Sequence, residues 1–192
     1  MKDFLVKAVS VAECAAQVAD VLDHPGSDTA WKHFCNDLPD GRGTWAFHQR
    51  GRILGDEAHY EARDSFSHSF YRDDALAAQG ARDLAAASDD FLSRLGYDRT
   101  GEGNGYRIRA GHDRRIAAFC HQGFGLHWLS HLLHIPYHIF TASFDISHTG
   151  VSILRFSDSG DGIAYPQCLC LSDLSHIYGD DLPLRYHDQL DI

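Results

Sequence analysis

Apolar residues recur at helical spacing in three parts of the chain, and each part is predicted to be a helix. These parts are residues 12–22, 74–95 and 126–133. In the second, leucine, alanine and phenylalanine side chains share one face. Gly96 follows it directly and is typical of a helix end, because glycine readily adopts the left-handed backbone conformation. Pro136 is expected to end the third helix.

Shorter apolar runs between these helices are predicted to be strands. They cover residues 4–9, 29–34, 115–120, 151–156 and 167–171. A further hairpin is expected within 98–111. The run at 115–120 is continuous, as in a strand buried on both faces of a parallel sheet. Because strands alternate with helices, we predict one α/β domain over residues 1–192, a three-layer sandwich with a mainly parallel sheet. Residues 36–72 have no clear period and are predicted to be an irregular excursion with helical pieces.

Composition and charge argue against several classes of protein. The formal net charge is -10, whereas a nucleic-acid-binding surface is usually basic. No run approaches the roughly 18 apolar residues of a membrane span, and the first residues are too charged for a secretory signal. Five scattered cysteines favour reduced thiols over a disulfide framework. We therefore expect a cytoplasmic protein without a nucleic-acid or membrane partner.

Histidine is unusually frequent, with 14 residues in the chain. Five lie close together: His121, His127, His131, His134 and His138. His127 and His131 are four residues apart on a predicted helix, which is the spacing of a metal half-site. A complete site needs further ligands and a supporting shell, and no His-Glu-x-x-His motif is present. Packing in the core is the other interpretation, and no metal or other cofactor is predicted.

His121 stands where a predicted strand turns into a predicted helix. The first amide groups of a helix have no partner within it, and the helix dipole is positive there. An anion such as phosphate would be well placed at this end. The predicted ligand-binding residues are His121 through its ring, and Gln122 and Gly123 through their backbone amides. A buried histidine bonded to the backbone is the alternative.

Four segments, in the right order, resemble the histidine phosphatase superfamily (phosphoglycerate mutase-like). Phe-Cys-His-Gln-Gly-Phe-Gly at 119–125, followed by Leu-Ser-His-Leu-Leu-His-Ile-Pro at 129–136, is similar to its second-histidine segment. Three more are similar to its His-Thr-Gly strand, its closing Ser-His element and a helix end of one bacterial branch: residues 145–154, 172–178 and 91–99. The resemblance implies a phosphoglycerate mutase-like fold and phosphoryl transfer through a phosphohistidine, with His121 binding the phosphoryl group.

The chain departs from this family at the motif that carries the nucleophile. No Arg-His-Gly is present, and the best positional match puts Ala8 where the nucleophilic histidine belongs. The family's Arg-Glu-Phe is matched only by residues 31–34, which contain no glutamate. We therefore expect a divergent member that binds a small anionic metabolite, phosphorylated or carboxylated, with a non-phosphatase reaction as one option. The alternatives are a phosphomonoester hydrolase shortened at its N-terminus and a pseudoenzyme that acts as an interaction module.

The catalytic candidates are His121 and His148, whose rings change charge near neutral pH. His148 is the expected neighbour of His121, because ligands of parallel α/β sheets collect at the carboxyl ends of the strands. Whether the chain is an enzyme is left open. A homodimer is predicted from the aromatic residues of the irregular excursion, with core packing as the other interpretation. These are Tyr60, Phe66, Phe70 and Tyr71.

Overall fold

The computed structural model describes a large part of the 192-residue chain, beginning at Cys35. The described residues are 35–37, 43–45, 50–66, 71, 74–101, 103–110, 116–118, 120 and 122–180. The strands predicted at 4–9 and 29–34, and the helix predicted at 12–22, lie outside them. No helix in the described ranges is long and apolar enough to span a bilayer.

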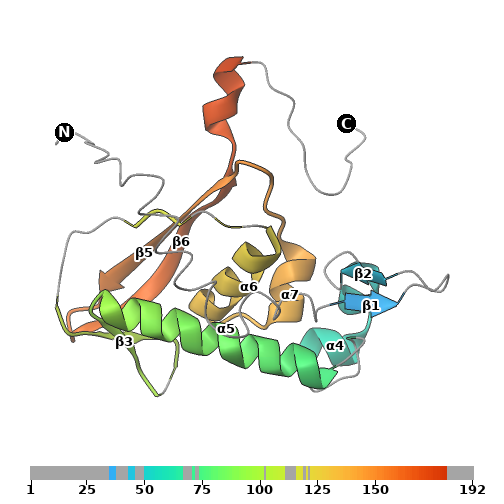
Figure 1. Ribbon diagram of the computed structural model, residues 1–192, viewed down its shortest axis with the longest axis horizontal. Coiled ribbons are helices and arrows are strands. Elements are labelled where there is room, and N and C mark those ends of the chain that lie inside the picture. Colours follow the sequence, from blue (N-terminus) through green and yellow to red (C-terminus); the bar gives the residue numbers. More distant parts are fainter. Residues whose placement is uncertain are drawn as a thin grey trace.

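The elements of the described part are short except for one long helix and one long hairpin (Figure 1). In chain order they are β1 (Cys35–Asp37), β2 (Gly43–Trp45), α3 (Arg50–Leu54), α4 (Glu57–Glu61), α5 (Asp74–Arg94), β3 (Tyr97–Arg99), β4 (Tyr106–Ile108), α6 (Gln122–Leu133), α7 (Tyr137–Ser143), β5 (Val151–Asp158), β6 (Ile163–Asp173) and the 3-10 helix η3 (Ser175–Asp180). The helices predicted at 74–95 and 126–133, and the strands predicted at 151–156 and 167–171, are confirmed.

The main sheet has four strands in the order β3-β4-β6-β5, and every neighbouring pair is antiparallel. The predicted three-layer sandwich with a mainly parallel sheet is therefore wrong. Short connections explain the difference, because a parallel pair needs a crossover of a dozen or more residues. Only residues 159–162 join β5 to β6, and only 100–105 join β3 to β4.

The β5–β6 turn is held by two of its own carboxylates. Asp158 Oδ1 accepts hydrogen bonds from the backbone amides of Gly160 at 2.8 Å and Gly162 at 3.1 Å. Asp161 Oδ1 accepts from the amide of Ile163 at 3.0 Å. Gly160 and Gly162 have φ angles of 98° and 78°, which other residues rarely adopt. These local bonds fix a tight reversal and hence the antiparallel pairing.

The strand predicted at 115–120 is not formed in the part of it that the structure describes. Residues 116–118 and 120 belong to no strand and are exposed. Ile116 alone is 39% exposed. A continuous apolar run indicates a buried strand only where neighbouring strands can pair with it. None of the strands in the described ranges pairs with this run.

α5 ends as its sequence predicts. Gly96 has a φ of 91°, and its amide donates to the carbonyl of Ser93 at 2.9 Å, which closes the last turn. The chain then reverses into the predicted hairpin, where Asp98 pairs with Arg107 in the β3–β4 ladder. α5 and β3 are thereby fixed side by side.

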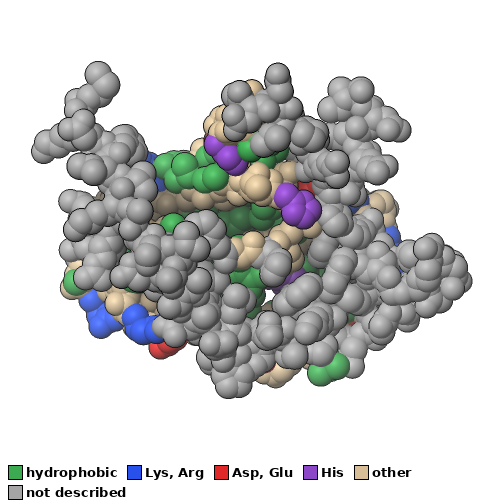
Figure 2. Space-filling model, turned by 45° about the horizontal axis from the view of Figure 1, so that its top comes forward, with side chains coloured by type: hydrophobic (Ala, Val, Ile, Leu, Met, Phe, Trp, Pro, Cys, Tyr) green, Lys and Arg blue, Asp and Glu red, His purple; other side chains and the backbone are tan. Residues whose placement is uncertain are grey.

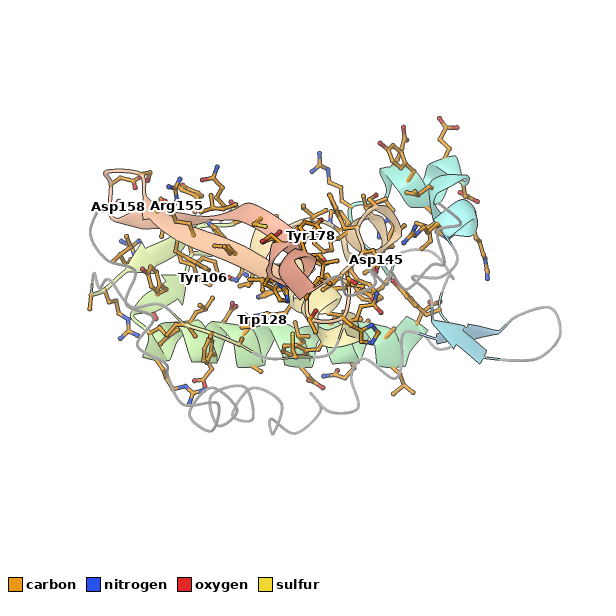
Figure 3. All side chains as sticks on the ribbon, turned by 90° about the horizontal axis from the view of Figure 1, so that it is seen from above. Tyr106, Trp128, Asp145, Arg155, Asp158 and Tyr178 are labelled. Carbon is orange, nitrogen blue, oxygen red and sulfur yellow. The ribbon has the colours of Figure 1, made fainter. Side chains whose placement is uncertain are left out.

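α5 and α6 cover one face of the sheet, called here the inner face. The buried cluster between them consists of Leu84, Ala87, Phe91, Leu92, Tyr106, Phe124 and Leu132. Leu154 and Phe156 of β5 pack against it from the sheet. Figure 3 shows Tyr106 and Trp128 between the hairpin and α5, whereas Arg155 lies on the other side of the hairpin. The opposite face of β5 and β6 is called the outer face.

Two of the aromatic residues on which the dimer prediction rested belong to the interior. Tyr71 is 6% exposed and stacks on Tyr137, with 6.4 Å between ring centroids. Phe66 is half-buried, with its ring centroid 5.5 Å from that of Tyr71. Tyr60 is exposed, and Phe70 lies outside the described residues. Core packing therefore accounts for Phe66 and Tyr71, and the dimer stays a prediction.

Candidate functional site

The candidate site is the N-terminal end of α6, which begins at Gln122. His121, its predicted central side chain, lies outside the described residues, so its role stays a prediction. Gln122 is half-buried and Gly123 is buried. Their amides belong to the first turn of α6, where the helix dipole favours negative charge.

A carboxylate of the chain itself lies against this end of α6. Asp145 Oδ1 accepts a hydrogen bond from the side-chain amide of Gln122 at 2.5 Å and another from the backbone amide of Ile146 at 2.8 Å. The Arg50 guanidinium is 4.0 Å from Asp145 Oδ2, and the Arg50 side chain is 42% exposed. The Gln122 side-chain amide, the Ile146 backbone amide and the Arg50 cation thus surround one negative group at the start of α6.

Cys120 packs beside this helix start. A Cβ built on Gly125 would be 3.4 Å from Cys120 Sγ and 3.4 Å from Ile146 Cδ1, so the glycine permits close approach of both segments. Although the residue keeps an exposed surface, burial of the thiol raises the pKa of Cys120 to about 11. The thiol is therefore protonated at neutral pH, which excludes it as a ready thiolate nucleophile.

His148 lies in the turn before β5, where its side chain is exposed. The turn is tight: Thr149 has a φ of 62°, and a Cβ on Gly150 would be 2.6 Å from Ser172 Oγ. The Ser147 amide donates to the same hydroxyl at 2.7 Å. The argument that placed His148 beside His121 required parallel strands, so it does not apply to this antiparallel sheet. The pairing of these two histidines stays untested.

His127 is buried one turn into α6. Its Nδ1 is 2.5 Å from the carbonyl oxygen of Gly123, to which the protonated nitrogen donates. Its ring stacks on Tyr137 with 3.7 Å between centroids. Burial lowers the pKa of His127 to about 3, with the Gly123 hydrogen bond acting in the opposite direction. His127 is therefore neutral at physiological pH and ties α6 to α7.

His131, one turn further on, belongs to a polar network between α5, α6 and the β3–β4 hairpin. Arg99 donates to Asp89 at 2.9 and 3.1 Å and to the Tyr106 hydroxyl at 2.5 Å. His131 Nε2 is 2.8 Å from an Arg99 nitrogen and 3.1 Å from Asp89 Oδ1. Arginine only donates and a carboxylate only accepts, so Nε2 accepts from Arg99 when unprotonated and donates to Asp89 when protonated.

The network shifts the titration of two of its members. Burial acts to raise the pKa of Asp89, but the hydrogen bonds from His131 and Arg99 outweigh it and hold this pKa below its usual value. Burial raises the pKa of Tyr106 to about 12, although the Arg99 guanidinium acts in the opposite direction. At neutral pH the network therefore contains an ionised carboxylate and a neutral phenol.

Among the described histidines of this cluster, His127, His131 and His138 have different partners. His138 Nε2 donates to the carbonyl oxygen of His59 at 2.6 Å, and its Nδ1 is 2.9 Å from Ser65 Oγ. His127 and His131 face α7 and α5 respectively, as described above. Over the described ranges, no group of three or more histidine, cysteine, aspartate or glutamate side chains could hold a metal ion. The four histidines from His127 to His138 thus give no support to the metal half-site.

Sequence reasoning missed the polar residues that organise α6. Asp89 and Arg99 are ten residues apart, on a helix and on a strand, and only the turn at Gly96 brings them together. Asp145 reaches Gln122 from 23 residues away. Asp89 lies off the apolar face of α5, so no sequence pattern marked it.

Comparisons with known proteins add no assignment: no protein-family model matches this chain, and no curated protein or solved structure gives a significant match.

Proposed function

We propose that this chain binds a small anionic metabolite, phosphorylated or carboxylated, at the N-terminal end of α6. The observation that carries the proposal is the set of donors around the Asp145 carboxylate. Gln122 donates to this carboxylate at 2.5 Å, and Arg50 lies 4.0 Å from it. Donors that hold a carboxylate of the chain have the geometry to hold one from a ligand, or a phosphate oxygen.

The exposure of Arg50 supports this proposal. Its side chain is 42% exposed, so an anion from solvent can reach the guanidinium. Asp145 itself competes with the ligand, because two negative groups close together repel each other. His121 and the Gly123 amide complete the proposed site, and His121 is the acid or base if a reaction occurs.

The direct test is titration of the purified chain with inorganic phosphate and with citrate, followed by calorimetry. Gln122→Ala should weaken binding about tenfold, the value of one hydrogen bond to a charged group. Gln79→Ala is the matched control, because Gln79 donates to Asp83 at 2.7 Å in the same kind of pair on α5. Binding that both variants weaken equally, or no binding by the unmodified chain, would reject the site.

His121→Ala separates a functional histidine from a structural one. The functional role predicts loss of phosphate binding with a nearly unchanged melting temperature. A structural role predicts destabilisation by about 1–3 kcal/mol with or without phosphate, from an unsatisfied buried partner. Turnover of a generic phosphate ester that this variant abolishes would instead identify a phosphomonoesterase whose nucleophile differs from the usual Arg-His-Gly histidine.

A further inference from the structure

A serine and a histidine that are far apart in the sequence form a hydrogen-bonded pair. His138 Nδ1 is 2.9 Å from Ser65 Oγ, and His138 Nε2 is 2.6 Å from the backbone carbonyl oxygen of His59. A carbonyl oxygen only accepts, so Nε2 carries the ring hydrogen, and the neutral ring then accepts at Nδ1. The Ser65 hydroxyl therefore donates its proton toward a nitrogen that can take it.

The segments that carry this pair are fixed by aromatic packing. Ser65 lies in a turn after α4, and His138 lies in the first turn of α7, where its backbone amide donates to Ser65 Oγ at 3.4 Å. The residues next to them in the chain, Phe66 and Tyr137, both pack against Tyr71, with 5.5 and 6.4 Å between ring centroids. The two side chains are thus held in register by a rigid surrounding, as a reactive pair requires.

We propose that Ser65 is a nucleophile activated by His138, and that this pair hydrolyses carboxylic esters. Activated nucleophiles share one geometry, in which nucleophile and base lie within hydrogen-bond reach and a third group orients the base. Here the third group is the His59 carbonyl, in the last turn of α4. The negative end of a helix favours the imidazolium that forms when the ring takes the proton. This pair shares no residue with the anion site at the start of α6.

The reaction balances with the ester, water and the two side chains alone. Ser65 Oγ bonds to the carbonyl carbon while its proton moves to His138 Nδ1. This proton then passes to the leaving alkoxide as the ester C–O bond breaks, which leaves an acyl-serine and an alcohol. Water, deprotonated by Nδ1, releases the carboxylic acid and restores the serine. An ester is assigned instead of an amide because an alkoxide leaves more readily than an amide nitrogen.

The two members of the pair differ in their access to solvent. Ser65 is half-buried, whereas His138 is only 3% exposed. The serine is therefore the member that lies nearer the surface, and a substrate meets the hydroxyl before the ring. A base in a site that excludes water also interacts more strongly with the charges that develop beside it.

Covalent labelling of the unmodified chain with a fluorophosphonate tests the proposal without any variant. The reagent phosphorylates an activated serine with loss of fluoride, and peptide mapping by mass spectrometry locates the adduct. We expect the adduct at Ser65 and none at Ser93, which is also half-buried but donates to the Asp98 carboxylate at 2.7 Å. A hydroxyl that only satisfies a buried histidine would not react. An unlabelled Ser65 therefore overturns the proposal, as does equal labelling of Ser93.

Hydrolysis of p-nitrophenyl acetate gives a second readout. Exposed histidines hydrolyse activated esters slowly by themselves, and Figure 2 shows histidine side chains at the surface, so their background rate must be subtracted. Ser65→Ala and His138→Gln should each lower the remaining rate by about a hundredfold or more, and Ser93→Ala should leave it unchanged. The melting temperature checks each fold, and Ser65→Ala decides if His138→Gln does not fold. A rate that Ser65→Ala leaves intact overturns the proposal.

Discussion

The two ends of α6 hold a carboxylate and an arginine in different ways. At the C-terminal end, Arg99 bonds both oxygens of Asp89 within 3.1 Å, and His131 and Tyr106 complete the network. At the N-terminal end, Arg50 lies 4.0 Å from Asp145, and the amides of Gln122 and Ile146 supply the close bonds. The Arg99 side chain is 18% exposed, against 42% for that of Arg50.

This difference separates a structural role from a functional one. A polar network in which each member is bonded rigidifies the elements around it and cannot accept a ligand without losing those bonds. At the N-terminal end, the Gln122 amide and the 42% exposed Arg50 side chain are the groups that a ligand anion would engage in place of Asp145. We therefore expect the first end to support the fold and the second to bind.

The largest expected effect is a loss of stability at low pH, caused by His127, which lies between the two ends of α6. His127 has a pKa near 3 when folded, below the usual value of about 6.5. The unfolded chain therefore binds the extra proton first, so stability is complete above about pH 6.5 and falls as the pH drops toward 3. Each pKa unit corresponds to 1.36 kcal/mol, which makes the loss about 4–5 kcal/mol.

Urea unfolding between pH 7 and pH 3 measures this loss. His127→Phe should flatten the decline, and His176→Ala, at an exposed position, should reproduce the unmodified curve. An unchanged pH dependence in His127→Phe would mean that His127 is charged or hydrated in the folded chain. A charge on His127 would then lie between the two ends of α6 and could affect both of them.

A smaller effect is expected from opening the C-terminal network. Arg99→Met removes the cation and leaves Asp89 partly buried without it, which should lower the free energy of unfolding by about 2–3 kcal/mol, less than for a fully buried pair. Arg94→Met is the control, because Arg94 pairs with Asp90 on the exposed side of the same helix. Exposed pairs contribute about 0–1 kcal/mol. Equal losses in urea unfolding would mean that the network is not structural.

The smallest effect is expected from Asp145 at the N-terminal end of α6. Asp145→Asn removes the competing negative charge while keeping an oxygen that accepts from Gln122. Phosphate affinity should rise about three- to tenfold, equivalent to roughly 0.7–1.4 kcal/mol. Calorimetric titration of both chains measures the change. A lower affinity in Asp145→Asn would show that the carboxylate supports the anion site through Arg50 or Gln122 instead of competing for it.

Local patterns predicted α5 and β5, but they missed α7 and gave a strand at 115–120 that the described residues do not form. The apolar face of residues 74–95 and the glycine after it were sufficient for α5, and the alternation at 151–156 was sufficient for β5. Strand direction was predicted wrongly, because alternation of strands and helices was given more weight than the short connections. The turn at 159–162 is visible in the sequence as two aspartates and two glycines, and by itself it requires an antiparallel pair.

The candidate site was predicted only in part. The helix was predicted from the apolar run at 126–133, whereas α6 begins four residues earlier, at Gln122. The partners Arg50 and Asp145 could not be predicted, because they lie 72 residues before and 23 residues after Gln122 and no local pattern connects them. Likewise, His127 and His131 look equivalent in sequence, and only packing against Tyr137 or Asp89 distinguishes them.

The self-contained turn between β5 and β6 also has a consequence for the order in which the sheet assembles. Its bonds involve residues only two to four positions apart, so closing it costs little chain entropy and a hairpin of this kind forms in about 1–10 µs. Pairing of Tyr106 with Ala164 joins residues 58 positions apart and must come later. Substitutions in the turn should therefore slow refolding, while those at the β4–β6 contact should mainly speed unfolding.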